Sequence, residues 1–270
     1  MPAASQPAAP AWGRALVAAG LVSLLLAGLW AAGRGGGGGD GRPALRLGVA
    51  SSLAPLLPEL ERAAGGLPGG GRRVEATLAS SGRIARQLGA GAPLDAVLLA
   101  DDEAMDRLEA DGLIDPSSRV GLAGNRLVLV APAGSQRPRG LGDLAGLRVA
   151  LGEPGTVPLG RYAEAALAAA AVPGPGRVVY GGSAEQVLTY VRAGEVDAAV
   201  VYATDLRRAG DALRLVEAVD PGLHPPARCP AAVAAEARDP AAAAALLRAL
   251  AGPGSRAAFE AAGFAPPEGR

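Results

Sequence analysis

From Leu45 onward, short runs rich in leucine and β-branched residues alternate with segments whose apolar residues recur every three or four positions. This alternation is typical of βαβ units and of a mainly parallel sheet. Strands are expected at residues 45–50, 74–79, 95–100, 126–131, 148–151, 177–180 and 198–202. Helices are expected at residues 53–64, 84–90, 103–111, 162–170, 185–193, 241–251 and 255–262. The sequence therefore predicts an α/β fold.

Two stretches interrupt the alternation. The polar, glycine-containing step at residues 122–125 separates two series of strands and helices, and a proline-rich stretch at residues 221–230 precedes the last helices. Two such interruptions predict that the chain forms two lobes and crosses from one to the other twice, at a hinge. We expect residues 44–123 and 223–270 to form lobe 1, and residues 124–222 to form lobe 2.

The first 43 residues differ from the rest. Arg14 precedes a nearly uninterrupted apolar run from Ala15 to Ala32, and a glycine run follows at residues 35–39. This order is typical of a secretory signal, although about 18 apolar residues also suffice for a membrane-spanning helix. We expect residues 1–43 to be a signal peptide or N-terminal anchor with a glycine-rich linker. Because no cysteine follows the apolar run, we expect no lipoprotein anchor.

The residue composition excludes several classes of function. Cys229 and His224 are the only residues of their types, and all 26 basic residues are arginine. A Cys/His zinc site, a disulfide and Schiff-base chemistry therefore cannot be assembled. Residues 1–43 hold three arginines and one aspartate, so the rest of the chain has a formal charge of −2. We therefore expect no nucleic-acid partner.

Serine- and glycine-rich junctions follow four of the expected strands, at residues 51–53, 80–82, 152–160 and 181–184. Each junction places a helix N-terminus at the carboxyl end of a strand, where unpaired backbone N–H groups and the helix dipole favour an anion. Ligands of open α/β sheets also gather at this end. A serine before a helix is most often only an N-cap. Four such ends together nevertheless predict a site for one anion.

Several of these runs resemble the molybdate-binding periplasmic protein of ABC transporters, in the same order along residues 45–264. The resemblance lies in residues 49–53 (VASSL), 78–87 (LASSGRIARQ), 89–95 (GAGAPLD), 152–154 (GEP), 157–163 (VPLGRYA) and 200–202 (VVY). It implies a two-lobed type II periplasmic binding protein fold with a mainly parallel sheet in each lobe. It also implies a periplasmic or extracytoplasmic monomer that is not an enzyme, holds no cofactor, binds molybdate or tungstate and delivers it to an ABC transporter permease.

The resemblance also assigns five residues to the ligand. Two serines would bind through hydroxyl and backbone N–H groups, two residues of lobe 2 through backbone N–H groups alone, and a tyrosine through its hydroxyl. In that order these are Ser52 and Ser81, Leu159 and Ala184, and Tyr202. No side chain would ligate the molybdenum itself. Neutral donors to an anion form strong hydrogen bonds, and a cavity of fixed radius would favour molybdate or tungstate over the smaller sulfate.

Other interpretations stay open. The ligand could be another oxyanion such as sulfate, and a retained N-terminal segment would make the protein a membrane-tethered anion sensor. A serine hydrolase that uses Ser52 or Ser81 with His224 is a further alternative, but neither serine lies in a G-x-S-x-G elbow.

Other polar residues have simpler interpretations. We expect Arg83 and Arg86 to be solvated, residues 101–103 to interact with a helix dipole, His224 to pack in a loop and Cys229 to be a small core residue.

Overall fold

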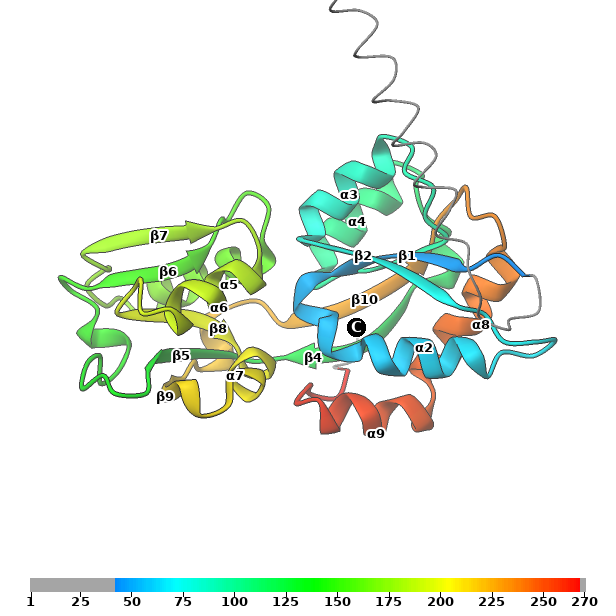
Figure 1. Cartoon of the computed structure of the whole chain (residues 1–270). Coiled ribbons are helices and arrows are strands. Elements are labelled where there is room, and N and C mark those ends of the chain that lie inside the picture. The colour runs from blue at the N-terminus through cyan, green and yellow to red at the C-terminus, as the bar shows by residue number, and fades with distance from the viewer. Residues whose placement is uncertain (1–41, 268–270) are drawn as a thin grey trace, which may run out of the picture. The chain divides into compact units, whose positions relative to one another are not determined.

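The computed structural model describes residues 42–267. The expected signal or anchor segment therefore lies almost entirely outside the described residues. Within residues 42–267, no helix combines the length and hydropathy that a membrane crossing requires. Two five-stranded sheets, each flanked by helices, form two α/β lobes (Figure 1). Lobe 1 denotes the sheet that contains β1 (Leu45–Ala50) with its helices, and lobe 2 the sheet that contains β5 (Leu127–Pro132) with its helices.

The sheet of lobe 1 has the strand order β2-β1-β3-β10-β4, in which β10 alone runs against the others. The other bounds are β2 Val74–Ala79, β3 Ala96–Leu98, β4 Val120–Asn125 and β10 Ala227–Val233. One face packs against α2 (Leu57–Gly65), α8 (Pro240–Ala251) and α9 (Pro253–Ala261), and the other against α3 (Ser81–Gly89) and α4 (Asp102–Ala110). Figure 1 shows α3 and α4 above this sheet and α2 and α9 below it.

The sheet of lobe 2 has the order β7-β6-β8-β5-β9, in which β5 alone runs against the others. Its bounds are β6 Arg148–Gly152, β7 Arg177–Gly181, β8 Ala198–Tyr202 and β9 Leu213–Ala218. Its helices are α5 (Pro158–Ala169), α6 (Ala184–Arg192) and α7 (Ala203–Ala209). Strand β8 lies at the centre and every residue of it is buried, as expected for a parallel strand covered on both faces. The predicted two-lobed fold with mainly parallel sheets is thus confirmed.

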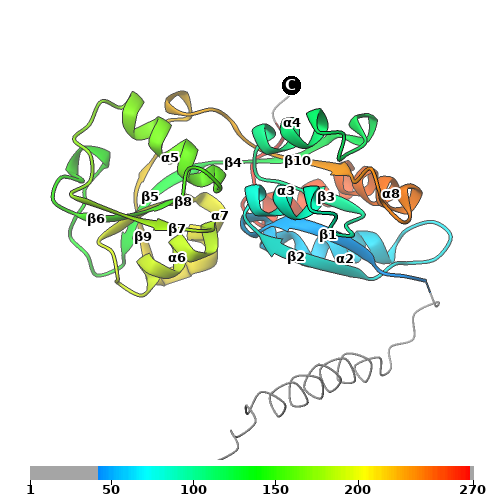
Figure 2. The same ribbon diagram turned by 90° about the horizontal axis from the view of Figure 1, so that it is seen from above.

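The chain crosses between the sheets twice, once from β4 to β5 at Arg126 and once from β9 to β10 across residues 219–226. Figure 2 shows both connections side by side between the lobes. A segment near the C-terminus adds to this region, since Gly124 and Ala265 exchange backbone hydrogen bonds of 2.8 and 2.9 Å. The two crossings that the sequence predicts are therefore present.

Four elements were not predicted: β4, β9, β10 and α7. Strand β10 contains Pro230, and a proline in a central strand argues against a strand assignment. In the structure the register against β4 shifts between Cys229 and Pro230, because β4 holds an extra residue, Leu122, at this point. Pro230 stays in the sheet, since it pairs with Gly121 and its carbonyl accepts the Leu99 N–H at 2.9 Å just past the end of β3. In β4, Gly121, Gly124 and Asn125 resemble a turn in composition, but the strand pairs with β10.

Candidate functional site

All five residues that the sequence assigns to a ligand line one small pocket between the lobes. Lobe 1 contributes Ala50, Ser51, Ser52, Ser80, Ser81 and Ala100, and lobe 2 contributes Val157, Pro158, Leu159, Ala184 and Tyr202. The cavity that these residues leave open to a water-sized sphere has a volume of about 10 Å³, far below the roughly 300–1,000 Å³ of pockets for drug-sized ligands. The pocket therefore has room only for a very small ligand. Whether the five residues bind one stays a prediction.

The two serines of lobe 1 lie where their strands end. Ser52 is in the 3₁₀ helix η2 (Ser51–Leu56) directly after β1, and Ser81 is the first residue of α3. Neither serves as an N-cap, and Ser80, which is at the N-cap position of α3, makes no side-chain capping bond. The Ser81 hydroxyl accepts a hydrogen bond of 3.0 Å from the Ala100 N–H, and a hydroxyl can also donate its own proton.

Lobe 2 presents two helix N-termini to the pocket. Leu159 is the second residue of α5, after Pro158, and Ala184 is the first residue of α6. Backbone N–H groups in the first turn have no intrahelical acceptor. At α6, the N-cap Ser183 satisfies the Gln186 N–H at 3.2 Å and leaves the Ala184 N–H for another acceptor. The arrangement thus offers backbone donors from two helices, with the favourable ends of their dipoles.

Tyr202 ends β8 and is 2% exposed. Its hydroxyl is buried and has no hydrogen-bond partner within the described residues. Burial raises the pKa of Tyr202 well above its usual value, so the hydroxyl keeps its proton. A buried polar group without a partner costs about 1–3 kcal/mol. A bound anion would supply the missing acceptor.

Among the described residues, no charged side chain lines this pocket, and no group of three or more His, Cys, Asp or Glu residues is placed to hold a metal ion. The polar groups that line it are therefore uncharged hydroxyl and backbone groups, set in a mostly apolar wall. Hydrogen bonds from such donors to an ionised acceptor contribute about 1.5–3 kcal/mol each. The pocket is equipped to hold an anion through dipoles instead of counter-charges.

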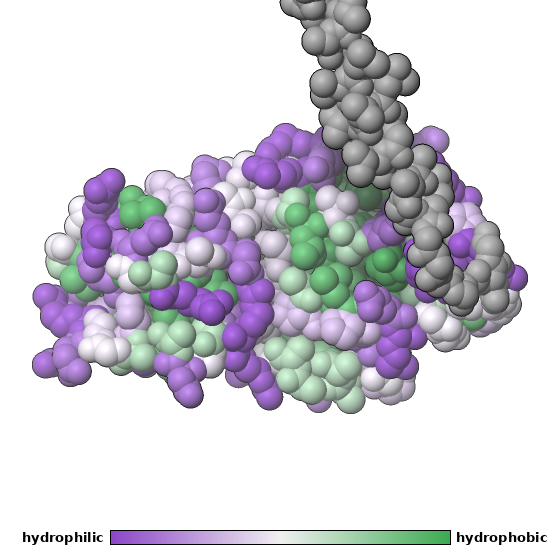
Figure 3. All heavy atoms as spheres, in the orientation of Figure 1, coloured by the Kyte–Doolittle hydropathy of each residue, from purple (hydrophilic) through white to green (hydrophobic). Residues whose placement is uncertain are grey.

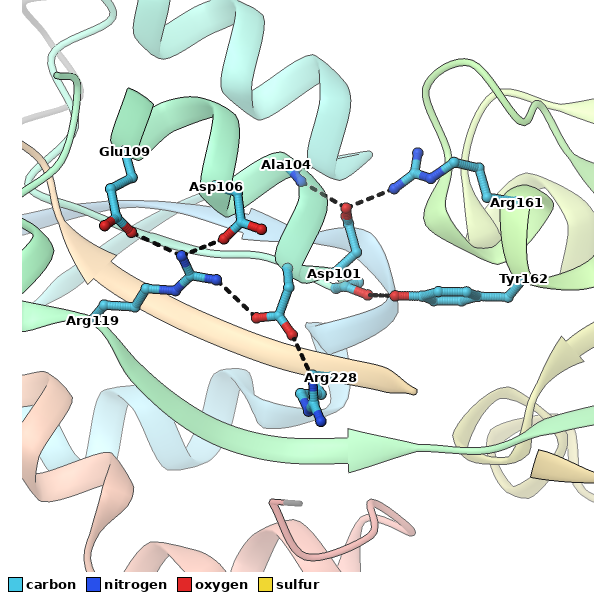
Figure 4. A network of polar contacts seen from close by, with 10 residues as sticks. Asp101, Ala104, Asp106, Glu109, Arg119, Arg161, Tyr162 and Arg228 are labelled. Atoms are coloured by element: carbon cyan, nitrogen blue, oxygen red, sulfur yellow. Dashed lines mark hydrogen bonds and ion pairs between the residues drawn. The ribbon is translucent and has the colours of Figure 1, made fainter. Parts of the chain in front are cut away.

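A buried carboxylate lies just behind the pocket wall. Asp101 follows Ala100, caps α4 by accepting the Ala104 N–H at 2.8 Å, and is 2% exposed. Arg161 of lobe 2 binds it at 2.6 Å (Figure 4). Arg161 also contacts Glu103 at 2.9 Å. Burial raises the pKa of Asp101, and Arg161 and the nearby Ser81 hydroxyl oppose that shift. The predicted role at a helix N-terminus is present, but the partner in the other lobe was not predicted.

The same close-up contains a second charged network that is confined to lobe 1. Arg119 binds Asp102, Asp106 and Glu109 at 3.0, 2.5 and 2.8 Å (Figure 4). Asp102 also pairs with Arg228 of β10 at 3.2 Å. This network fastens α4 to the chain around the crossing and keeps the N-terminus of α4, with Asp101, in place.

Gly82 is a point of close backbone approach between the lobes. Its N–H donates to the Thr156 carbonyl at 3.3 Å, and a Cβ at this position would lie 3.0 Å from that oxygen. The absence of a side chain at Gly82 therefore admits the backbone of lobe 2.

A wider groove adjoins the pocket and shares Ser51 and Ser80 with it. Arg83 and Arg208 line this groove, whereas Arg86 does not. Leu78, on the edge strand β2, also lines it and is 45% exposed. Figure 3 shows apolar surface gathered over this part of lobe 1. Both Arg83 and Arg86 are exposed, as expected.

His224 and Cys229 lie away from the pocket wall. The His224 ring packs 5.8 Å from that of Tyr162, and its Nδ1 atom lies 2.7 Å from the Pro225 carbonyl oxygen. His224 does not line the pocket that contains Ser52 and Ser81. Burial raises the pKa of Cys229 to about 12, so its thiol stays protonated. The predicted loop packing of His224 and burial of Cys229 are confirmed.

Two α/β lobes, two chain crossings and a small donor-lined pocket between the lobes define the class of two-lobed binding proteins. Residues 45–265 match the family model of bacterial extracellular solute-binding proteins. The chain belongs to this family.

Individual relatives bear out the resemblance found in the sequence. The molybdate-binding protein ModA of Escherichia coli (strain K12) is 41% identical over 102 residues, which cover 35% of this chain and 40% of that protein. The chain spans about half the length of the curated relatives it matches.

Two solved structures share the fold at 20% identity and cover 83% of this chain each. The periplasmic molybdate-binding protein of Azotobacter vinelandii has a TM-score of 0.71 with all of its chain covered, and the sulfate-binding protein SubI of Mycobacterium tuberculosis has 0.70 with 87% covered.

Proposed function

We propose that this protein captures molybdate or tungstate between its lobes outside the cytoplasm and delivers it to the permease of an ABC transporter. The observation that carries the proposal is the pocket itself, in which residues from both lobes place uncharged donors around one small space. The unpartnered Tyr202 hydroxyl supports it most directly, because this buried donor needs an acceptor. Ser52, Ser81, Leu159 and Ala184 would supply the remaining hydrogen bonds.

The donor set favours fully deprotonated oxyanions. Phosphate carries a proton at neutral pH and would need an acceptor, and the pocket wall includes no carboxylate among the described residues. Sulfate carries no proton and meets the same donors, so it is the second candidate. Because the donors are fixed on helix ends and strand ends, the radius of the cavity would discriminate between sulfate and the larger molybdate and tungstate.

Delivery to a permease would depend on closure of the lobes. Contacts between the lobes, such as Arg161 with Asp101, would form only when the pocket is shut. A ligand that binds both lobes would shift the population toward this form, since it binds that form better. The closed surface would then be what the permease recognises. If the N-terminal segment is retained, the protein is a tethered sensor or binding protein, which sequencing of the mature N-terminus distinguishes.

The test is a thermal-shift and calorimetry panel of molybdate, tungstate, sulfate, phosphate and thiosulfate on the purified protein. Ligand at 100 times its dissociation constant stabilises a protein by about 2.7 kcal/mol. We expect molybdate and tungstate to raise the melting temperature and to bind at a 1:1 ratio. A response to sulfate alone would select the second candidate, and a response to none of the five anions would refute the proposal.

A further inference from the structure

Two carboxylates lie close behind the donors that lobe 2 presents to the pocket. Glu185 directly follows Ala184 in the first turn of α6. Asp205 lies in the first turn of α7, is fully buried, and accepts the Tyr202 backbone N–H at 3.3 Å. Each carboxylate therefore accompanies a residue that would touch the ligand. Uncompensated, both would repel a dianion in the pocket.

One arginine contacts both carboxylates. The Nη2 atom of Arg208 binds Glu185 and lies 3.3 Å from an oxygen of Asp205. Its side chain is 33% exposed on the wall of the adjoining groove, and it does not line the pocket. Arg208 is in the last turn of α7, but its guanidinium thus lies beside the first turn of α6 and beside Asp205 in the first turn of α7. Arg208 is not a ligand residue itself.

This position sets the electrostatic balance around the pocket. On the side of lobe 1, Asp101 lies behind the pocket wall and is neutralised in the same manner by Arg161 of lobe 2. The pocket thus has no cation among its described lining residues, but each buried carboxylate behind it has an arginine partner. Interactions between charges are weakly screened where water is excluded. The net charge of each arginine–carboxylate pair therefore affects the binding of a dianion more than the hydrogen-bond geometry within the pair does.

We propose that Arg208 is a charge-compensating residue, which allows a dianion to bind beside Glu185 and Asp205 without touching that ligand. The inference rests on the proposed function. According to this inference, Arg208 raises ligand affinity through its positive charge and not by linking α6 to α7 through its ion pairs with Glu185 and Asp205. The two roles differ in what they predict for Glu185, because removing its carboxylate breaks the tie but also removes a repulsive charge.

The experiment compares molybdate dissociation constants by calorimetry at pH 8 for the wild type and Arg208→Gln, Arg208→Lys, Glu185→Gln and the double variant Arg208→Gln/Glu185→Gln. Arg207→Gln is the matched control, since Arg207 is exposed on the same helix and lines neither the pocket nor the groove. We expect Arg208→Gln to weaken binding roughly tenfold, because one charge is lost near a dianion. Arg208→Lys and Arg207→Gln should stay within about threefold of the wild type, as expected where charge and not hydrogen-bond geometry decides.

The Glu185 variants decide between the two roles. Glu185→Gln should bind molybdate at least as tightly as the wild type, and the double variant should regain most of the affinity lost in Arg208→Gln. An unchanged affinity in Arg208→Gln, or a loss above threefold in Glu185→Gln, would overturn the inference. If Arg208→Gln does not fold, Glu185→Gln and Arg208→Lys still carry the test. Failure of the wild type to bind any oxyanion would instead refute the proposed function.

Discussion

The Nη2 atom of Arg161 in α5 lies 2.6 Å from the Oδ1 atom of Asp101 at the N-terminus of α4. A buried carboxylate of lobe 1 thus takes its counter-ion from lobe 2. Asp101 follows Ala100, whose N–H donates to the Ser81 hydroxyl in the pocket. Separation of the lobes would remove the counter-ion from a carboxylate adjacent to a predicted ligand residue. Closure and the geometry of the pocket are therefore linked through this pair.

Replacement of Arg161 by Gln should weaken both ligand binding and the folded state. The substitution leaves the Asp101 carboxylate buried without its cation, and we expect the free energy of unfolding to fall by about 1–3 kcal/mol. This loss is smaller than for a fully buried ion pair because Arg161 is partly exposed. Urea denaturation and molybdate calorimetry measure the two effects. Arg107→Gln is the control, since Arg107 forms an exposed pair with Glu103 at 3.1 Å. Equal behaviour of the two variants would contradict a role for the pair between the lobes.

Replacement of Tyr202 by Phe should separate affinity from stability. The ligand-free protein loses only an unpartnered hydroxyl, so its stability should stay the same or rise by up to about 1 kcal/mol. Molybdate affinity should fall roughly tenfold, since one hydrogen bond to an anion is lost. Tyr162→Phe is the control, because the Tyr162 hydroxyl donates to the Ala100 carbonyl at 3.4 Å and does not line the pocket. Similar affinities of both variants would refute the assignment of Tyr202.

Replacement of Ser81 by Ala should lower both affinity and stability. The change removes a donor to the ligand and also the acceptor of the buried Ala100 N–H, which we expect to cost about 1–3 kcal/mol in unfolding free energy. Arg86→Ala, on the exposed side of the same helix, should change neither quantity appreciably. A large loss of molybdate affinity in Arg86→Ala would mean that the ligand lies elsewhere.

Replacement of Gly82 by Ala should oppose closure without destabilising lobe 1. The new Cβ would lie 3.0 Å from the Thr156 oxygen and 3.2 Å from its Cα, so the lobes would have to move apart. Within a helix, alanine is favoured over glycine by up to about 1 kcal/mol, so the ligand-free protein should not lose stability. We expect molybdate affinity to fall about fivefold, a loss of about 1 kcal/mol. Gly89→Ala, whose Cβ would lie 3.6 Å from Leu113, should retain full affinity.

The pH dependence of stability should report on Asp205. Burial raises the pKa of Asp205 from 3.8 to about 7, although Arg208 opposes the shift. Between these values the folded state binds the proton and the unfolded state has released it, so stability falls as pH rises from about 4 to 7. Asp205→Asn should remove this component, which is on the order of 4 kcal/mol over the whole range and about 3 kcal/mol between pH 5 and pH 8. Urea denaturation at pH 5 and pH 8 measures it, and parallel pH profiles for the two proteins would contradict the assignment.

The local pattern of the sequence was sufficient for much of the fold. Strands β1, β2 and β8 match the predicted residues in full. The signals that predict them, which are the pattern of apolar residues, the strand propensity of each residue and the flanking glycines, depend only on residues close together in the sequence. Strand β10 could not be predicted in this way. Its Pro230 argues against a strand in local terms, and the partner strand β4, with which it pairs across a register shift, lies more than 100 residues earlier in the chain.

The same division applies to the site. The resemblance of the serine pairs, the VPLGRYA run and the end of β8 to the molybdate-binding family assigns Ser52, Ser81, Leu159, Ala184 and Tyr202 to a ligand. Local structure places donors at strand ends and helix starts. Only the tertiary structure brings them around one pocket, pairs Arg161 with Asp101 across 60 residues, and places Arg208 between two helix N-termini. The physical reason is that ion pairs and burial depend on how separate elements pack, and no local pattern encodes that packing.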